Sequence, residues 1–340
     1  MKLRSLLAAV ATLASAAVFA PAHAETLTMS SWVPPTHYVQ KEILEPWMAE
    51  VNKVTEGRVT IKILPKPVGS PPQHWELARK GVADITWGNF TYEPDRFKSI
   101  WFAEMPFVGD SGAASSQALW DTYQKFLANN AAYQGVVMLG VGTLGGGHFN
   151  HGSKPIATIA DLKNQKIRMG GPIQKRLLEE LGAIPIAAPG PKAYELLEGG
   201  VIDASLHSME SVVAFRVEEK LKHHTKIPGG LYDATFFIGM NSGKWSKLSE
   251  ADRAAIMKVS GLALSKRWGA QFDRQSKLAE EKMRKEKHTF TEPSKELVEK
   301  VASIRSAMIK DWVAEGSSYG VDKPRDMLAY FEQQYKLYAK

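Results

Sequence analysis

Apolar and polar positions near the start of the chain follow a strand pattern, then a helix pattern, then a strand pattern again. Residues 26–31 are typical of a short strand, and residues 58–64 alternate apolar and polar side chains as a strand does. Between them, residues 38–55 place apolar side chains on one helical face, and Gly57 ends the predicted helix. Pro46 is expected to kink this helix, because proline has no backbone N–H to donate. The strand–helix–strand order predicts a parallel sheet.

The same order of elements returns in the middle of the chain. Residues 166–169 predict a strand, and a helix is expected to begin near Pro172 and run through Leu181, with Gly182 as its C-terminal cap. Residues 183–188 predict a further strand. The sequence therefore predicts a second α/β unit.

Two stretches about 119 residues apart resemble each other. Residues 76–86 and 195–205 share Glu, Leu, Gly, Val and Asp at matched offsets, and each predicts a helix end, a glycine turn and a short strand. Five matches in eleven positions can arise by chance, but we favour two similar α/β lobes. Asp84 and Asp203 match within this repeat. We expect them to share a structural role at a strand start rather than to act as an acid–base pair.

The last part of the chain carries mostly helical patterns. Ser249 is expected to cap a helix, with Asp252 reaching back as in a capping box. Helical patterning then continues to about residue 288, which requires a break or an unusually long helix. Further helices are expected over residues 294–315 and 325–338. The fold class predicted by the whole pattern is α/β, with parallel or mixed sheets flanked by helices and a helical C-terminal region.

The composition excludes several classes of protein. Of 340 residues, 44% are hydrophobic and 23% are charged, which excludes a disordered chain, collagen and a membrane bundle. The sequence has no cysteine, so a disulfide scaffold, a cysteine nucleophile and cysteine-ligated metal sites are excluded. The net charge of +7 is not arranged as a basic stripe interleaved with aromatic residues. We therefore expect no nucleic-acid partner.

Residues 1–24 have the pattern of a secretory signal. Lys2 and Arg4 precede an apolar stretch from Leu6 to Ala20, and Ala22-His23-Ala24 is a small-x-small cleavage site. The apolar stretch is shorter than the roughly 20 residues that span a bilayer. We expect cleavage before Glu25 and export to a bacterial periplasm, with an uncleaved N-terminal anchor as the alternative.

Loops at the ends of predicted strands carry the candidate binding residues. In open α/β sheets, ligands bind outside the carboxyl ends of the strands, near helix N-termini. This rule selects residues 31–37, 87–90, 170–171 and 207–210, which are richer in Trp, His and Asn than packing requires. The side chains that we expect to bind a ligand there are Trp32, His37, Trp87, Asn89, Phe90 and His207.

Arg168 is the most specific single candidate for a ligand-binding residue. It ends a predicted strand and precedes a helix N-terminus, where a guanidinium beside unpaired backbone N–H groups would form a bidentate carboxylate site. The alternative is an ordinary surface arginine on an edge strand.

No set of residues indicates catalysis, nucleotide binding or a metal. The turn Gly145-Gly146-Gly147 could bind an anion through its N–H groups, but it lacks the lysine of a P-loop, and a flexible connection between lobes fits equally well. There is no G-x-S-x-G or H-E-x-x-H motif. His148 and His151 lie three residues apart with no third ligand specified. We expect neither a metal nor another cofactor.

Three segments carry the most specific residues of a family pattern. The pattern as a whole extends over essentially all of residues 26–310. They run from Lys154 to Arg168, from Ala193 to Asp203 with its Gly-Val-Ile-Asp turn, and from Met240 to Leu248. These segments resemble the solute-binding proteins of TRAP transporters, the DctP type.

The resemblance implies a two-lobed protein that closes on an organic acid and delivers it to a membrane permease driven by an ion gradient. We expect residues 25–145 plus 233–275 to form one lobe. Residues 146–232 plus 276–340 are expected to form the second lobe and the C-terminal helices. Delivery of a ligand to permease subunits works with a monomer, which is the state we expect.

The resemblance also assigns binding positions. The carboxylate-binding arginine of the family falls on Arg168, and a first-lobe polar contact falls on Asn89. Positions that are often arginine or asparagine in the family are His148 and His207 here, which argues against the usual small sugar acids and dicarboxylates. Asn89 with Trp32, Trp87 and Phe90 instead suggests a monocarboxylate with a bulky, aromatic body. His148 is expected to help neutralise it in its cationic form.

Other functions stay open from the residues alone. A binding protein of an ATP-driven importer, a ligand-sensing domain of a receptor and a periplasmic hydrolase are the alternatives. The hydrolase would need a nucleophile or a metal set, and the sequence specifies neither.

Overall fold

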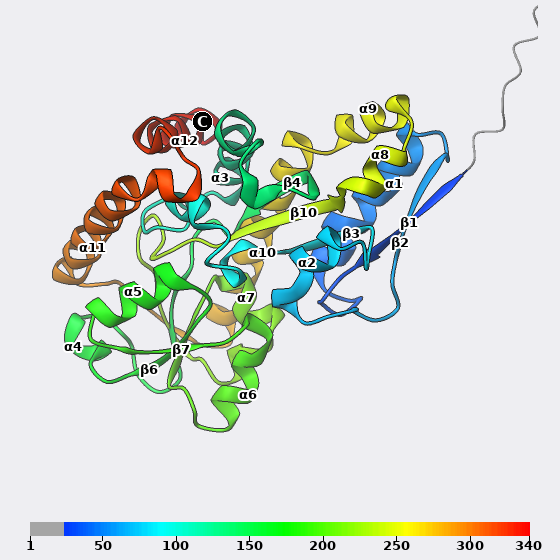
Figure 1. The fold of residues 1–340 in the computed structure, drawn as a ribbon. Helices are drawn as coiled ribbons and strands as arrows, with labels where there is room; N and C mark the ends of the chain where they lie inside the picture. Colours follow the sequence, from blue (N-terminus) through cyan, green and yellow to red (C-terminus); the bar gives the residue numbers. More distant parts are fainter. Residues whose placement is uncertain (1–23) are drawn as a thin grey trace, which may run out of the picture.

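The protein is described by a computed structural model over residues 24–340 and has an α/β fold with two mixed sheets flanked by helices (Figure 1). The signal predicted at residues 1–24 lies outside the described residues apart from Ala24. In spatial order, the first sheet contains β2 (Val59–Ile63), β1 (Glu25–Ser30), β3 (Ile85–Asn89), β10 (Thr235–Asn241) and β4 (Val136–Thr143). The second contains β11 (Thr289–Thr291), β9 (His223–Thr225), β5 (His148–His151), β8 (Ala204–His207), β6 (Lys166–Met169) and β7 (Ile184–Ala187).

Each sheet joins parallel strands to antiparallel ones. Strand β1 pairs in parallel with β2 and β3, whereas β10 runs antiparallel to β3 and β4. In the second sheet, β6 pairs in parallel with β7 and β8, and β5 runs antiparallel to β8 and β9. The chain thus crosses from the first sheet to the second after β4, returns for β10, and crosses again to the second sheet for β11.

The helices cover the faces and edges of these sheets (Figure 1). In chain order they are α1 (Glu45–Val54), α2 (His74–Arg79), α3 (Gly112–Thr122), α4 (Ile159–Leu162), α5 (Pro172–Glu180), α6 (Ala193–Glu198), α7 (Met209–Ala214), α8 (Ser242–Lys247), α9 (Glu250–Val259), α10 (Leu262–Lys285), α11 (Lys295–Ala314) and α12 (Pro324–Tyr338). No helix in the part of the chain from residue 24 to residue 340 is both long and apolar enough to span a membrane.

The predicted helix over residues 38–55 forms in two parts. A π-helical segment, Val39–Leu44, precedes α1, and Pro46 lies in the first turn of α1. Proline cannot donate the hydrogen bond that a continuous α-helix needs at this position. The wider turn before it is the local consequence, so the expected irregularity is confirmed.

The internal repeat is confirmed as a pair of helix–turn–strand units, α2–β3 and α6–β8. Their turns contain Gly81 and Gly200, whose φ angles are 68° and 65°, a region that L side chains rarely adopt. Asp84 Oδ2 accepts a hydrogen bond from Thr28 N–H at 2.7 Å, and Asp203 Oδ2 accepts one from Lys166 N–H at 2.8 Å. Each aspartate therefore ties its own strand to the neighbouring parallel strand, which confirms the matched structural role.

The long helical stretch after Ser249 breaks once. Gly261 has a φ angle of 58° and separates α9 from α10, and a Cβ atom there would lie 2.8 Å from the Trp120 ring. Helix α10 then packs against α3 and β4 on the side of the first sheet and against α7 on the side of the second. Both predicted outcomes, a break and a long helix, occur. Helix α12 packs mainly on α3, so the C-terminal helices also contact the first-sheet side.

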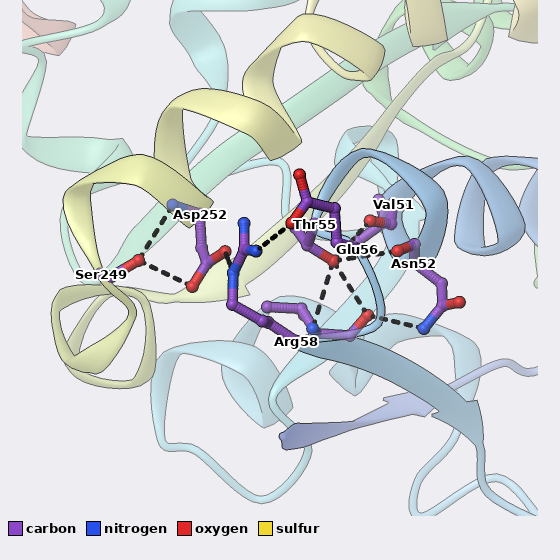
Figure 2. Close-up of polar contacts among 8 residues, drawn as sticks. Val51, Asn52, Thr55, Glu56, Arg58, Ser249 and Asp252 are labelled. Atoms are coloured by element: carbon purple, nitrogen blue, oxygen red, sulfur yellow. Dashed lines mark hydrogen bonds and ion pairs between the residues drawn. The ribbon is translucent and has the colours of Figure 1, made fainter. Parts of the chain in front are cut away.

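The start of α9 is fixed by Ser249 and Asp252 (Figure 2). Asp252 N–H donates to Ser249 Oγ at 3.0 Å, and the Ser249 hydroxyl donates to the Asp252 carboxylate at 2.7 Å. The Asp252 carboxylate therefore binds the Ser249 hydroxyl rather than its backbone N–H, which differs from the expected capping box. Arg58 Nε also donates to Asp252 at 2.8 Å, which anchors α9 to the start of β2.

Candidate ligand-binding site

A pocket with an empty volume of about 580 Å³ lies between the two sheets. The loops after β1 and β3 line it from the first sheet, and residues of β6, β8 and α7 line it from the second. All four predicted loops contribute residues to this pocket, as expected if ligands bind outside the carboxyl ends of the strands.

Arg168 is buried in this pocket, with 5% of its surface exposed. Its Nε donates to Ala188 O at 2.8 Å, and its Nη1 donates to Leu206 O at 3.0 Å. These carbonyl groups belong to the segments on either side of β6, so the guanidinium is held from both sides. Its Nη2 makes no hydrogen bond within residues 24–340, and none of the ion pairs found there involves Arg168. The alternative of a surface arginine on an edge strand is therefore wrong.

Two tryptophans form an apolar wall of the pocket. The rings of Trp32 and Trp87 stack with centroids 4.4 Å apart and planes 28° apart. Trp87 Nε1 donates to Ser31 Oγ at 3.0 Å, which fixes the inner ring. Phe236 and Phe272 extend the wall. Flat aromatic surfaces of this kind suit a flat apolar ligand body.

Asn89 caps the short helical turn that follows β3. Its Oδ1 accepts the N–H of Thr91 at 2.8 Å, so its amide NH₂ is the group available to a ligand. The position therefore supplies a donor at the edge of the tryptophan wall.

His37 and His207 line the pocket in uncharged form. Burial lowers the pKa of His37 to about 4. Burial lowers the pKa of His207 well below its ordinary value, and the neighbouring positive charge of Arg168 adds to this effect. Arg168 is therefore the cation that these three predicted residues offer to a ligand.

A cluster of polar side chains was not predicted from the sequence. Glu210 is buried on α7, where it accepts hydrogen bonds from the hydroxyls of Ser208 at 2.6 Å, Ser211, and Tyr38 at 2.9 Å. Burial raises the pKa of Glu210, although these hydrogen bonds oppose the change. Glu210 lies inside the loop 207–210, but its spacing gives no sign of Tyr38, which is 172 residues away.

Phe90 and His148 lie elsewhere. Phe90 packs in the core against Trp75 and Phe97, with ring centroids 6.2 and 4.7 Å apart. His148 lines a separate, more polar cavity that also contains Lys226. Its Nδ1 accepts the N–H of Ile227 at 3.3 Å, and burial lowers its pKa to about 3. The expectation that a cationic His148 helps to neutralise the ligand is therefore not supported by its place in the fold.

Comparisons with solved structures identify close structural relatives. A TRAP periplasmic solute-binding protein from Bordetella bronchiseptica, solved with bound (R)- and (S)-mandelate, is 35% identical with a TM-score of 0.88 and covers 92% of this chain and 99% of its own. A TRAP solute-binding protein from Rhodoferax ferrireducens in complex with copurified benzoate is 27% identical with a TM-score of 0.85, covering 93% of this chain and 98% of its own.

A curated relative and a family model agree with these structures. The relative, named outer membrane transporter protein TsaT of Comamonas testosteroni, is 29% identical over 323 residues, which is 95% of each chain. The model of the DctP family, described as bacterial extracellular solute-binding protein, family 7, matches residues 29–315. These relatives are named as binding or transporter proteins. The resemblance in the sequence is therefore confirmed, and the chain belongs to the DctP-type solute-binding proteins of TRAP transporters, bacterial extracellular solute-binding protein family 7.

Proposed function

We propose that this protein captures an aromatic monocarboxylate in the periplasm and delivers it to the permease subunits of a TRAP transporter. The observation that carries the proposal is the buried guanidinium of Arg168 in a pocket with an apolar wall of Trp32 and Trp87. Two carbonyl groups hold this guanidinium, and its Nη2 has no hydrogen-bond partner among the described residues. One cationic donor and one flat apolar wall match a ligand with one carboxylate and one ring.

The carboxylate binds at Arg168. A buried, charge-assisted hydrogen bond is stronger than the same bond in water, because the surrounding protein screens charge less. The amide NH₂ of Asn89 supplies a second donor. A ligand with two carboxylates would leave one of them without a cation, since His37 and His207 are uncharged at neutral pH.

The ring of the ligand lies against Trp32. Relatives support an aromatic ligand, because the proteins from Bordetella and Rhodoferax were solved with mandelate and benzoate. A marine metagenome relative that is 28% identical, described as specific for aromatic acid ligands, was solved with 3-hydroxybenzoate.

Ligand capture involves closure of two lobes, with residues 25–145 plus 233–275 forming one and residues 146–232 plus 276–340 the other. Contacts across the pocket support this arrangement. Gly190 N–H donates to Tyr92 Oη at 3.1 Å, and Tyr38 donates to Glu210. The permease distinguishes the closed from the open form, because the ligand shifts the equilibrium between them. The extracytoplasmic family and the signal pattern of residues 1–24 support a periplasmic location.

A thermal-shift screen tests the proposal. The mature protein, stripped of ligand, is mixed with benzoate, phenylacetate, succinate, glucuronate and a neutral sugar. A ligand at 100 times its Kd stabilises the protein by about 2.7 kcal/mol, which is easily measured. We expect shifts with the aromatic acids that disappear in Arg168→Ala and persist in the exposed control Arg325→Ala. Much tighter binding of succinate than of any aromatic acid would contradict the proposal.

A further inference from the structure

His37, Tyr38 and Glu210 line the pocket with polar groups. A simple aromatic acid, with one carboxylate and one ring, has no polar group left to pair with them. Three buried nitrogen atoms of pocket residues lack a hydrogen-bond partner among residues 24–340, namely Trp32 Nε1, His37 Nε2 and His207 Nε2. Buried polar groups without partners are uncommon in native proteins, and each one calls for an explanation. A ligand that carries a second polar group would supply one.

The tautomer of His37 follows from its neighbours. Its Nδ1 accepts the backbone N–H of Val39 at 3.2 Å, so Nδ1 carries no proton. Burial lowers the pKa of His37 to about 4, so the ring is neutral near pH 7 and its proton lies on Nε2. His37 therefore offers a hydrogen-bond donor without a partner among the described residues of the pocket.

Glu210 is an acceptor in the same region. Only 3% of it is exposed, and its two oxygens receive hydrogen bonds from Ser208, Ser211 and Tyr38. The three hydroxyl donors favour its ionised form, which opposes the burial that raises its pKa. An ionised carboxylate has about four acceptor positions, so one position is left. None of the ion pairs within residues 24–340 involves Glu210.

His37, Tyr38 and Glu210 are contiguous. The His37 ring stacks on the Tyr38 ring with centroids 4.6 Å apart, and the Tyr38 hydroxyl lies 2.9 Å from Glu210 Oε2. The pocket lining thus contains a donor, His37, and an acceptor, Glu210, that are linked through Tyr38, in addition to the cation of Arg168.

Resting on the proposed function, we infer that the ligand is a hydroxylated aromatic monocarboxylate whose hydroxyl donates to Glu210 and accepts from His37 Nε2–H. A hydroxyl group can do both at once. An amino group can donate to Glu210 but gives His37 no good acceptor, and a second carboxylate would be repelled by Glu210. Glu210 and His37 are therefore specificity-determining residues, while Arg168 binds the carboxylate common to all candidates.

Calorimetry with matched ligands tests the inference. The pairs are benzoate with its 3- and 4-hydroxy derivatives, and phenylacetate with mandelate; 3-aminobenzoate and isophthalate complete the set. In the wild type, at least one hydroxy acid binds ten times or more tighter than its parent. In Glu210→Gln the ratio of hydroxy-acid to parent-acid affinity falls to a few-fold, and isophthalate gains affinity relative to the parent acid; these ratios cancel any common loss from the weaker bond to Tyr38. The control Glu218→Gln, a buried carboxyl outside the pocket, keeps the wild-type pattern.

His37→Phe provides a second variant that keeps the ring stacked on Tyr38 and removes the donor. It should also lower the ratio of hydroxy-acid to parent-acid affinity. Equal affinities for parent and hydroxy acids in the wild type, or an unchanged preference in both variants, would overturn the inference while leaving the proposed function intact. Failure of every aromatic acid to bind would instead overturn the proposed function.

Discussion

The hydroxyl of Tyr38 donates to the carboxylate of Glu210 at 2.9 Å, across the pocket between the two sheets. Tyr38 follows the first strand of one sheet, and Glu210 lies on α7, directly after β8 of the other. The contact can form only when the two sides are close, so in the proposed two-lobe arrangement it belongs to the closed form.

Tyr38→Phe removes this bond and keeps the ring. A hydrogen bond to a charged group contributes about 1.5–3 kcal/mol, so we expect ligand affinity to fall about tenfold or more, mainly through faster dissociation. Calorimetry and stopped-flow fluorescence measure both quantities. Unchanged affinity would show that the bond does not contribute to closure.

Gly171→Ala should obstruct closure. A Cβ atom at this position would lie 1.9 Å from Thr91 Cγ2, and Thr91 belongs to the first-sheet side. The φ angle of Gly171 is −162°, which any residue adopts, so the effect is a steric one between the two sides. We expect affinity to fall at least tenfold, and small-angle scattering should no longer show compaction on ligand addition.

Thr91→Ser in the Gly171→Ala background provides the matched control. Serine lacks Cγ2 but keeps the hydroxyl that donates to Glu104. The second change should restore most of the lost affinity. Without such a restoration, the collision would not be the cause of the defect.

Trp32→Leu tests the aromatic wall. An aromatic pair contributes about 0.5–1.5 kcal/mol beyond buried area, so an aromatic acid should lose roughly two- to tenfold in affinity. Trp245→Leu, a similarly half-buried tryptophan outside the pocket, is the control. Equal losses of affinity in the two variants would show that Trp32 does not contact the ligand.

Asp233 makes stability depend on pH. Burial raises its pKa to about 8, so the folded protein keeps a proton that the unfolded chain releases from about pH 4 upward. Wild-type stability should therefore fall as the pH rises through this window. The side chain of Asp233→Asn cannot titrate, so this variant lacks that loss of stability. The difference in melting temperature, variant minus wild type, should therefore rise by several degrees from pH 5 to pH 8.5. Each pKa unit corresponds to about 1.4 kcal/mol of stability. The exposed control Asp95→Asn should show no such trend, and a flat difference for Asp233→Asn would refute the shift.

Much of this architecture follows from the sequence, because its signals are local. The matched Asp84 and Asp203 predict matched strand starts, and the glycine turns before them have the positive φ angles that such turns need. Arg168 could be selected because a strand end before a helix is visible in a short window. These features depend on neighbours in the chain.

The misplaced and missed residues depend on contacts between distant segments. Phe90 is one residue beyond Asn89, but the helical turn after β3 directs it into the core against Trp75. The partnership of Tyr38 and Glu210 arises only when the two sheets are placed together. Sequence spacing alone cannot show such contacts.

A crystal structure of the mature protein with its tightest aromatic acid tests the central claim most directly. We predict a carboxylate oxygen within hydrogen-bond distance of Arg168 Nη2 and the ligand ring against Trp32. A carboxylate bound away from Arg168, or a ring outside the pocket between the two sheets, would contradict the account.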